Sequence, residues 1–438
     1  MDTKSLFGQV VKAATAFGLT VGKFTKTESE YERTFVNSKG AAKDVEQPEE
    51  YLRPVEFEDD DETRVFVEIC KHFLNDVEAS AGLNPEDGVY QDPHWGHTTG
   101  FFAGELSIDP HNLKKGYQDF RVGLFKEKRK FDVVVRPNFL FDDEPTIAIS
   151  RMSIKIKHPE LVDNQFSDSK KAHELDLLLS EGLPLKHHEA DGQGFFFRDA
   201  KQMLMLLELG AATKWGKLGM AGHAGHSRVL AHWGKGVFQA NTDALYKPKQ
   251  MQLGWAGKYF YSAGPYALGD GAMKFCLKPL QEHKIEPTLD FDDAAQGAIR
   301  REHNWPEQAG DEIKFLLMVQ IAKAEAIDRP EGEGHPPKSV MAAEYTDISW
   351  DDKIAEFEEV GVLTIKRETP DDWKDIDYFA NLPISAWNTF DATRPLGQLF
   401  RARRVVHPAH RKERLTKVFG DEKGVHSWTC PFSGGGKF

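Results

Sequence analysis

The stretch RARRVVHPAHRKER, residues 401–414, holds six Lys or Arg residues and two histidines in fourteen positions. Guanidinium groups bind phosphates and carboxylates, and imidazole is both a metal ligand and a proton carrier near neutral pH. The stretch could be a basic patch for a polyanion, the solvated face of a helix, or the rim of a buried cofactor site. No aromatic side chain interleaves the arginines, which argues against stacking on nucleic-acid bases. Taken alone, the stretch favours a helix with one buried face and a cationic outer face.

Two other groups of histidines have spacings that could support chemistry. His223, His226 and His232 lie in HAGHSRVLAH, where a pair three residues apart could share a helix face and bind a metal. The glycine-rich surroundings and the lack of a carboxylate at metalloprotease spacing favour loop histidines instead. His187 and His188, in the polar segment KHHEADGQG, are interpreted in the same way. The sequence contains no GxSxG, Walker or kinase signature.

Composition narrows the class of protein. The 438 residues carry a net charge of −13, and an acidic chain is a poor nucleic-acid binder, so no nucleic-acid partner is expected. The cysteines Cys70, Cys276 and Cys430 form no CxxC pair, which favours a reducing compartment, the cytoplasm before an organelle. No apolar run approaches the ~20 residues that span a bilayer. Apolar residues at helical spacing between Leu6 and Phe17 predict an amphipathic arm that packs on the body or on a partner, with membrane association as the less favoured alternative.

The elements that must position these residues are mainly strands. Alternating apolar segments predict strands within 99–108, 130–141, 146–157, 258–279, 312–326 and 359–369, and residues 195–210 change to helical periodicity. This order predicts an α+β protein built on a large closed or strongly curved antiparallel sheet. The chain divides into an N-terminal helical and extended arm (1–62), a main domain (63–420) and a C-terminal tail (421–438).

Several segments, in order, resemble blocks of the haem catalase superfamily, in particular its catalase-related branch with the allene oxide synthases. The blocks are FDVVVRPNFLFDDEPTIAISRMSIKI, GQGFFFRDAKQ, KYFYSAGPYALGDGAMKFCLKP and LPISAWNTFDATRPLGQLFRARR, the last similar to the element before the proximal haem helix. The resemblance runs from about residue 88 to residue 418. It implies an eight-stranded antiparallel β-barrel with helical additions and a buried haem b, which makes 63–420 a catalase-like haem domain.

The resemblance places the proximal side of the haem in the stretch 401–414. In the family an Arg stands four residues before the iron ligand and another seven residues after it, which selects Arg403, His407 and Arg414. HPAHRKERL is similar to the family's Tyr–Pro–x–x–x–x–x–Arg–Leu, so His407 stands where the family has tyrosine. Neutral imidazole is also a good iron ligand. His407 is the expected axial ligand and metal-binding residue, and loss of both the ligand and haem is the alternative.

On the distal side the resemblance implies a histidine just before the first strand. YQDPHWGHTTGFFAGEL occupies that place, with His94 as the first candidate and His97 as the second. Such a histidine acts as a general base that takes a proton from a hydroperoxide and returns it to the leaving oxygen. Arg136, in VVVRPN, matches a family arginine that suits propionate carboxylates. Gln91 and Arg151 depart from the family, which has Arg and Gly at these positions, and no distal Asn is evident.

The function that these residues imply is that of a catalase-related haem protein acting on hydrogen peroxide or on organic hydroperoxides such as those of fatty acids. Because tyrosinate and a distal Asn are both absent, peroxidase-like activity is expected rather than efficient catalase activity. The alternative is a haem-free protein of the same fold that serves as a structural or interaction subunit. The resemblance also implies a homodimer that associates through exchanged N-terminal arms.

Overall fold

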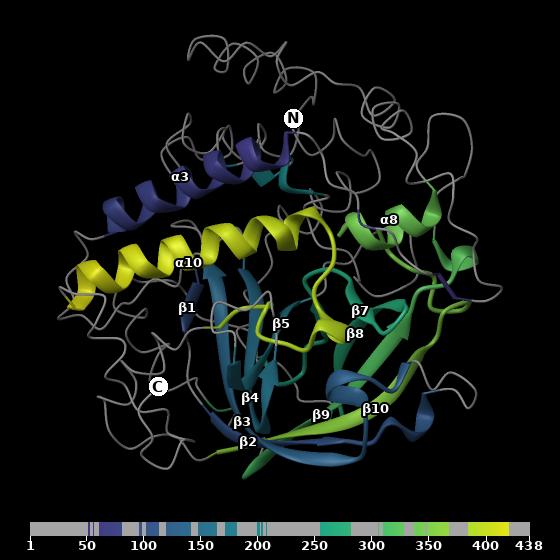
Figure 1. Cartoon of the computed structure of the whole chain (residues 1–438). Helices are drawn as coiled ribbons and strands as arrows, with labels where there is room; N and C mark the ends of the chain where they lie inside the picture. The colour runs from purple at the N-terminus through teal and green to yellow at the C-terminus, as the bar shows by residue number, and fades with distance from the viewer. Residues whose placement is uncertain are drawn as a thin grey trace, which may run out of the picture.

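Antiparallel strands close into a barrel in the computed structural model of the chain (Figure 1). The structure describes residues 51–52, 56, 61–80, 96–98, 102–113, 120–141, 148–163, 171–181, 199–201, 203–204, 207, 255–281, 305, 310–327, 337–346, 348–367 and 384–419. The helices and strands are α3 (Glu62–Ser80), β1 (Gly96–Thr98), β2 (Phe102–Ile108), β3 (Arg129–Phe141), β4 (Ala148–Asp163), β5 (Lys171–Glu181), β6 (Phe260–Ser262), β7 (Tyr266–Leu268), β8 (Gly271–Pro279), β9 (Glu312–Ile321), α8 (Lys338–Glu344), β10 (Phe357–Lys366) and α10 (Gln398–Phe419).

The closed ring contains all strands of the ten-stranded sheet except β1 and β7. Hydrogen-bonded neighbours follow the order β3, β2, β10, β9, β8, β6, β5 and β4, and the pairing of β3 with β4 completes the ring. β1 extends the sheet beside the end of β3, and β7 pairs with β8. The predicted α+β fold, an eight-stranded antiparallel β-barrel with helical additions, is therefore confirmed.

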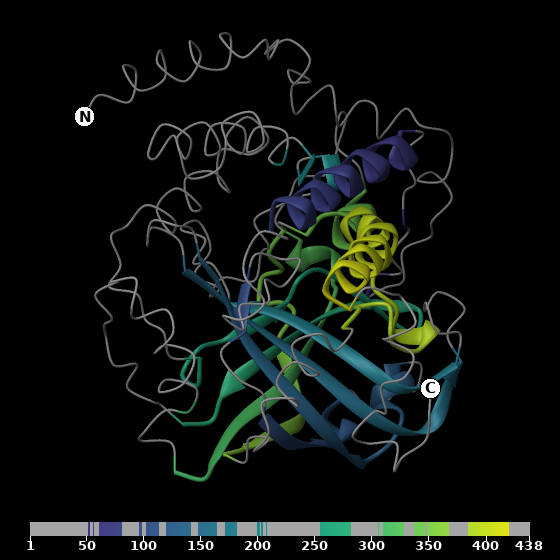
Figure 2. The same cartoon turned by 90° about the vertical axis from the view of Figure 1, so that its left-hand side faces the viewer.

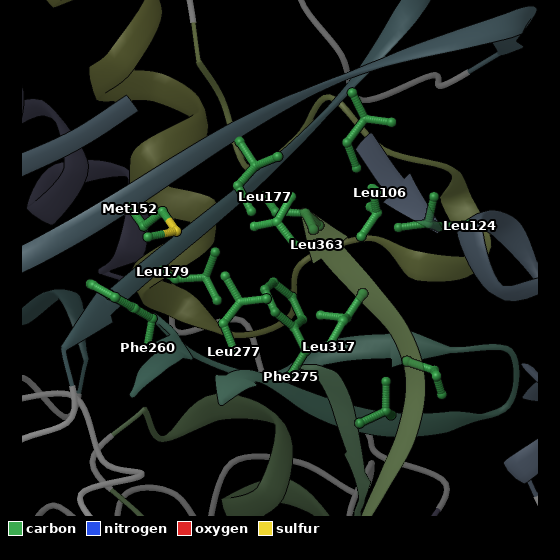
Figure 3. Packing of buried hydrophobic residues seen from close by; sticks show 14 of the residues in the cluster. Leu106, Leu124, Met152, Leu177, Leu179, Phe260, Phe275, Leu277, Leu317 and Leu363 are labelled. Atoms are coloured by element: carbon green, nitrogen blue, oxygen red, sulfur yellow. The ribbon is translucent and has the colours of Figure 1, made fainter. Parts of the chain in front are cut away.

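Apolar side chains of alternate positions fill the barrel interior. Val133, Val135, Met152, Ile154 and Ile156 are each at most 1% exposed and belong to one cluster with the inward residues of the other strands. Leu177, Leu277, Leu317 and Leu363, among others, point toward one another in this core (Figure 3). Since side chains of a strand alternate between faces, the residues between these apolar positions lie on the outer face.

On β3, β4 and β5 part of the outer face carries polar residues that are nevertheless covered. Arg136, Ser153, Lys155 and Asp176 are exposed by 7%, 5%, 1% and 0%, although their neighbours along the strands point into the core. The segment 384–391 and the start of α10 approach this face, and the backbone N–H of Asp176 donates to the carbonyl of Asn388 at 2.8 Å. Burying polar groups is costly unless they are hydrogen-bonded, so this covered polar face is a candidate binding site.

α10 crosses one end of the barrel, and α3 lies beside it (Figures 1 and 2). The two helices share a small apolar cluster in which Val65, Ile69 and Phe73 of α3 meet Ala402 and Val406 of α10. α8 belongs to another cluster, around buried residues such as Met341, Tyr345 and Trp350. No helix in the described part of the chain is long and apolar enough to cross a membrane.

The six predicted strand segments all contain strands, with one correction at a boundary. The segment 312–326 was expected to be extended throughout, but β9 ends at Ile321 and a single 3-10 turn covers Ala324–Ala326. The apolar periodicity of the sequence did not predict β5 or α3. The division into arm, main domain and tail stays a prediction.

Candidate site at the barrel end

The stretch 401–414 is helical, as predicted, and lies within α10. Gly397 sets the start of this helix, because its φ is +89° and an added Cβ would lie 2.5 Å from the carbonyl oxygen of Ala343. The Gly397 N–H donates to Glu56 Oε1 at 3.2 Å. Pro408 lies inside the helix and has no N–H to offer the carbonyl of Arg404, and the helix continues through it to Phe419.

Arg401 joins α10 to three other parts of the chain. Its guanidinium donates to the carboxylates of Glu62 on α3 at 2.8–3.1 Å, Glu344 on α8 at 3.0 Å, and Glu56 at 3.1 Å. Glu344 and Glu62 raise the pKa of Arg401 despite the opposing effect of burial. Arg394 shares Glu56, at 2.7 Å. The first arginine of the stretch therefore holds the fold together and is not available to a polyanion.

The next arginines of the stretch point in two further directions. The Cζ of Arg404 lies 5.4 Å from the ring centre of Trp387, whose indole N–H donates to the carbonyl of Phe400 at 2.8 Å. The Cζ of Arg403 lies 5.1 Å from the ring centre of Phe400. The side chains of Arg401, Arg403 and Arg404 thus have three different sets of neighbours. They do not form one basic patch at this end of the stretch.

Arg403 stands in a cationic environment. Burial lowers the pKa of its guanidinium to about 10, Tyr266 opposes that effect, and the like charge of Arg151 adds to it. Arg151 is on β4, where it lies opposite Asn138 of β3 and Ser180 of β5. The guanidinium of Arg136, a residue that is 7% exposed, belongs to the same outer face as Arg151. Guanidinium groups gathered in this way are suited to planar anions such as carboxylates.

The strand register brings β1, which contains the distal candidate His97, into the same row of the sheet as Arg151. Thr98 of β1 lies opposite Asn138, which in turn lies opposite Arg151, so the row runs from β1 through β3 to β4. His97 is the adjacent position, opposite Phe139. Arg151 therefore lies in the same row of the sheet as Thr98 of β1, and its like charge acts on Arg403 of α10.

Below this region a buried ion pair fixes the segment that leads into α10. Lys155 Nζ lies 2.8 Å from Asp176 Oδ1 and 2.9 Å from Glu174 Oε2. Asp176 Oδ2 accepts from the Ser385 N–H at 2.9 Å and from Asn388 Nδ2 at 2.7 Å. The attraction of the two carboxylates outweighs burial and raises the pKa of Lys155. The barrel thereby holds residues 385–388, and Trp387 within this segment holds the first turn of α10 through its hydrogen bond to Phe400.

The predicted site residues that the structure describes lie on α10, on the outer face of the barrel and on β1. Arg403 and His407 lie one helical turn apart on α10, both half-buried, and Arg136 lies on the covered outer face. The backbone of Arg414 is seven positions after His407 in the same helix, and His97 is in β1, while His94 lies outside the described residues. His187, His188, His223, His226 and His232 also lie outside them. Within the described ranges, no three His, Cys, Asp or Glu side chains form a group that could hold a metal.

Three residues of this region were not predicted from the sequence: Tyr266, Lys155 and Asp176. Arg151 was noted only as a departure from the family pattern. One signal was present, because Arg151, Ser153 and Lys155 alternate with Met152, Ile154 and Ile156 along β4 and so predict a polar outer face.

A closed eight-stranded antiparallel barrel, with a covered cationic face under a C-terminal helix, is the class of architecture that this chain adopts. The chain is similar to solved catalases. A bacterial catalase aligns with a TM-score of 0.47 and 14% identity over 73% of this chain and 56% of that chain. A fungal catalase gives 0.48 and 13% over 78% and 64%, and catalase A from Saccharomyces cerevisiae gives 0.46 and 12% over 81% and 69%. The chain thus spans less than two thirds of the first two of these solved proteins. No family model and no curated protein matches its sequence.

Proposed function

We propose that the chain is a catalase-related haem protein that acts on hydrogen peroxide or on organic hydroperoxides. The observation that carries this proposal is the position of Arg151: β1 reaches its row through Asn138, and its like charge acts on Arg403 of α10. A site between a cationic face and a helix that presents an imidazole has the ligands that haem requires. These are a nitrogen donor for iron and guanidinium groups for two carboxylates.

The donor set supports specific roles for the residues. His407 would present its imidazole to iron, and Arg403 and Arg151 would hold propionate carboxylates by charge and hydrogen bonds. Arg136 and Arg414 are proposed as further cationic groups of this site. Bound haem would supply the redox chemistry, and the chain would supply binding, orientation and exclusion of water.

A histidine of the β1 segment would move the proton. His94 or His97 would take it from the hydroperoxide and return it to the leaving oxygen as a general acid. Thr98 lies in the row that ends at Arg151, which supports the placement of this segment beside the site, and His97, one position away, lies on the opposite face of the strand. Because an imidazole replaces tyrosinate on the proximal side, we propose peroxidase-like turnover of hydroperoxides and only slow disproportionation of hydrogen peroxide.

The test compares haem-reconstituted wild type with three variants, with consumption of hydrogen peroxide and of a fatty-acid hydroperoxide as readouts. His407→Ala is expected to lose activity, and either His94→Ala or His97→Ala should lower the rate by about 100-fold or more. His111→Ala is the matched control, because the imidazole of His111 is 76% exposed and lies on a surface turn. Haem binding without turnover in wild type would contradict the enzymatic proposal, and failure to bind haem would favour a haem-free interaction subunit.

A further inference from the structure

Tyr266 has a buried hydroxyl group that finds no hydrogen-bond partner in the described part of the chain. The residue is 2% exposed, and its Oη has no partner among the described residues. Its ring is fixed by Phe275, with ring centres 4.9 Å apart, and by Phe400, at 5.0 Å. A buried hydroxyl without a partner costs free energy, so its presence needs an explanation outside the stability of the chain.

The same Phe400 ring also supports Arg403, whose Cζ lies 5.1 Å from its centre. Tyr266 and Arg403 therefore flank one aromatic ring at the start of α10. Burial raises the pKa of Tyr266, so the phenol stays neutral and can donate its proton in a hydrogen bond. Asp176 is the other charged group that acts on Tyr266, and its carboxylate already accepts from Lys155, Ser385 and Asn388.

We propose that the Tyr266 hydroxyl and the Arg403 guanidinium form a binding site for a carboxylate. The phenol supplies one neutral donor and the guanidinium supplies charge with further donors, while Arg151 adds a second positive charge. This set matches a planar anion that has several acceptor lone pairs and a single negative charge.

The inference rests on the proposed function when the carboxylate is a haem propionate, and it stands without that function when the carboxylate is free. A residue retained for a ligand has a recognisable signature: removing it weakens ligand binding without lowering the stability of the unliganded chain. Tyr266→Phe removes only the hydroxyl and keeps the ring contacts with Phe275 and Phe400. Tyr345→Phe is the matched control, because Tyr345 is also buried, at 1% exposure, but belongs to the cluster around α8.

Three probes are titrated into the full chain: haem, haem dimethyl ester, whose propionates carry no charge, and acetate. Tyr266→Phe is expected to bind haem about tenfold or more weakly than wild type, and to bind the dimethyl ester as wild type does. The midpoint of thermal unfolding of unliganded Tyr266→Phe should equal or exceed that of wild type, and Tyr345→Phe should bind all probes as wild type does. Equal haem affinity in wild type and Tyr266→Phe, or the same loss for haem and its ester, would overturn the inference. A lower midpoint in unliganded Tyr266→Phe would do so as well.

Acetate separates the inference from the proposed function. If wild type binds no haem, the proposed function fails, and thermal unfolding in acetate decides the inference alone. A rise of the midpoint in wild type but not in Tyr266→Phe supports a site for free carboxylates. The same response to acetate in both proteins overturns it.

Discussion

The buried ion pair of Lys155 and Asp176 makes a quantitative prediction for the stability of the barrel. Lys155 is 1% exposed and Asp176 is fully buried, with 2.8 Å between Nζ and Oδ1. Lys155→Met removes the cation and leaves a buried carboxylate without its counter-charge, which should cost about 3–5 kcal/mol in the free energy of unfolding. Asp176→Asn is expected to cost only about 1–3 kcal/mol, because Lys155 keeps Glu174 at 2.9 Å and the amide oxygen can still accept from the Ser385 N–H.

The order of the variants is the sharper part of this prediction. Lys155→Met/Asp176→Asn leaves no buried charge in the pair, so the double variant should be more stable than Lys155→Met alone. Lys130→Met is the control: its partner Glu105 is 2.7 Å away, but both side chains are exposed, at 69% and 40%, and the cost should be about 0–1 kcal/mol. Urea unfolding followed by circular dichroism measures all four. A double variant less stable than Lys155→Met, or equal costs at Lys155 and Lys130, would refute the reasoning.

Three further predictions concern the helix junction and the barrel surface. Arg401→Ala leaves Glu56, Glu62 and Glu344 without their shared cation and should cost about 3–5 kcal/mol, whereas Arg404→Ala, which loses one contact with Trp387, should cost about 1 kcal/mol or less in the same unfolding assay. Gly397→Ala should destabilise more than Gly310→Ala, since both have positive φ but only Gly397 meets a backbone oxygen at 2.5 Å, and equal thermal midpoints would contradict this. Lys128 and His111 lower the pKa of Asp109 to about 2. The contribution of Asp109 to stability is therefore complete above about pH 4 and is lost as the pH falls toward 2. Asp109→Asn should abolish that part of the pH dependence of the urea midpoint.

The sequence predicted the barrel well because most of its strands alternate apolar and polar residues. Val133 and Val135 on β3, and Ile154 and Ile156 on β4, define one face by period alone. β5 was missed because Glu174 and Asp176 suggest a solvated segment, and only the tertiary pairing with Lys155 explains why the fold can bury them.

The site was predicted less completely, for a physical reason. Helical spacing places Arg403 and His407 together, but it does not reveal that Arg401 is bound by carboxylates from three distant segments. The role proposed for Tyr266 depends on a hydroxyl without a partner among the described residues, and a sequence pattern cannot show an unsatisfied hydroxyl. Long-range contacts of this kind come only from the folded chain.

We propose that His407 on α10 binds the iron when haem is present. The most direct measurement is the absorption spectrum of the purified chain titrated with haem, for wild type and for His407→Gly, with and without added imidazole. Gly in a helix interior costs about 1 kcal/mol, which the folded domain should tolerate. We expect one saturable haem site in wild type, an altered Soret band in His407→Gly, and recovery of the wild-type band when imidazole enters the space left by the side chain. A wild-type spectrum in His407→Gly without imidazole, or no saturable haem binding in wild type, would contradict the proposal.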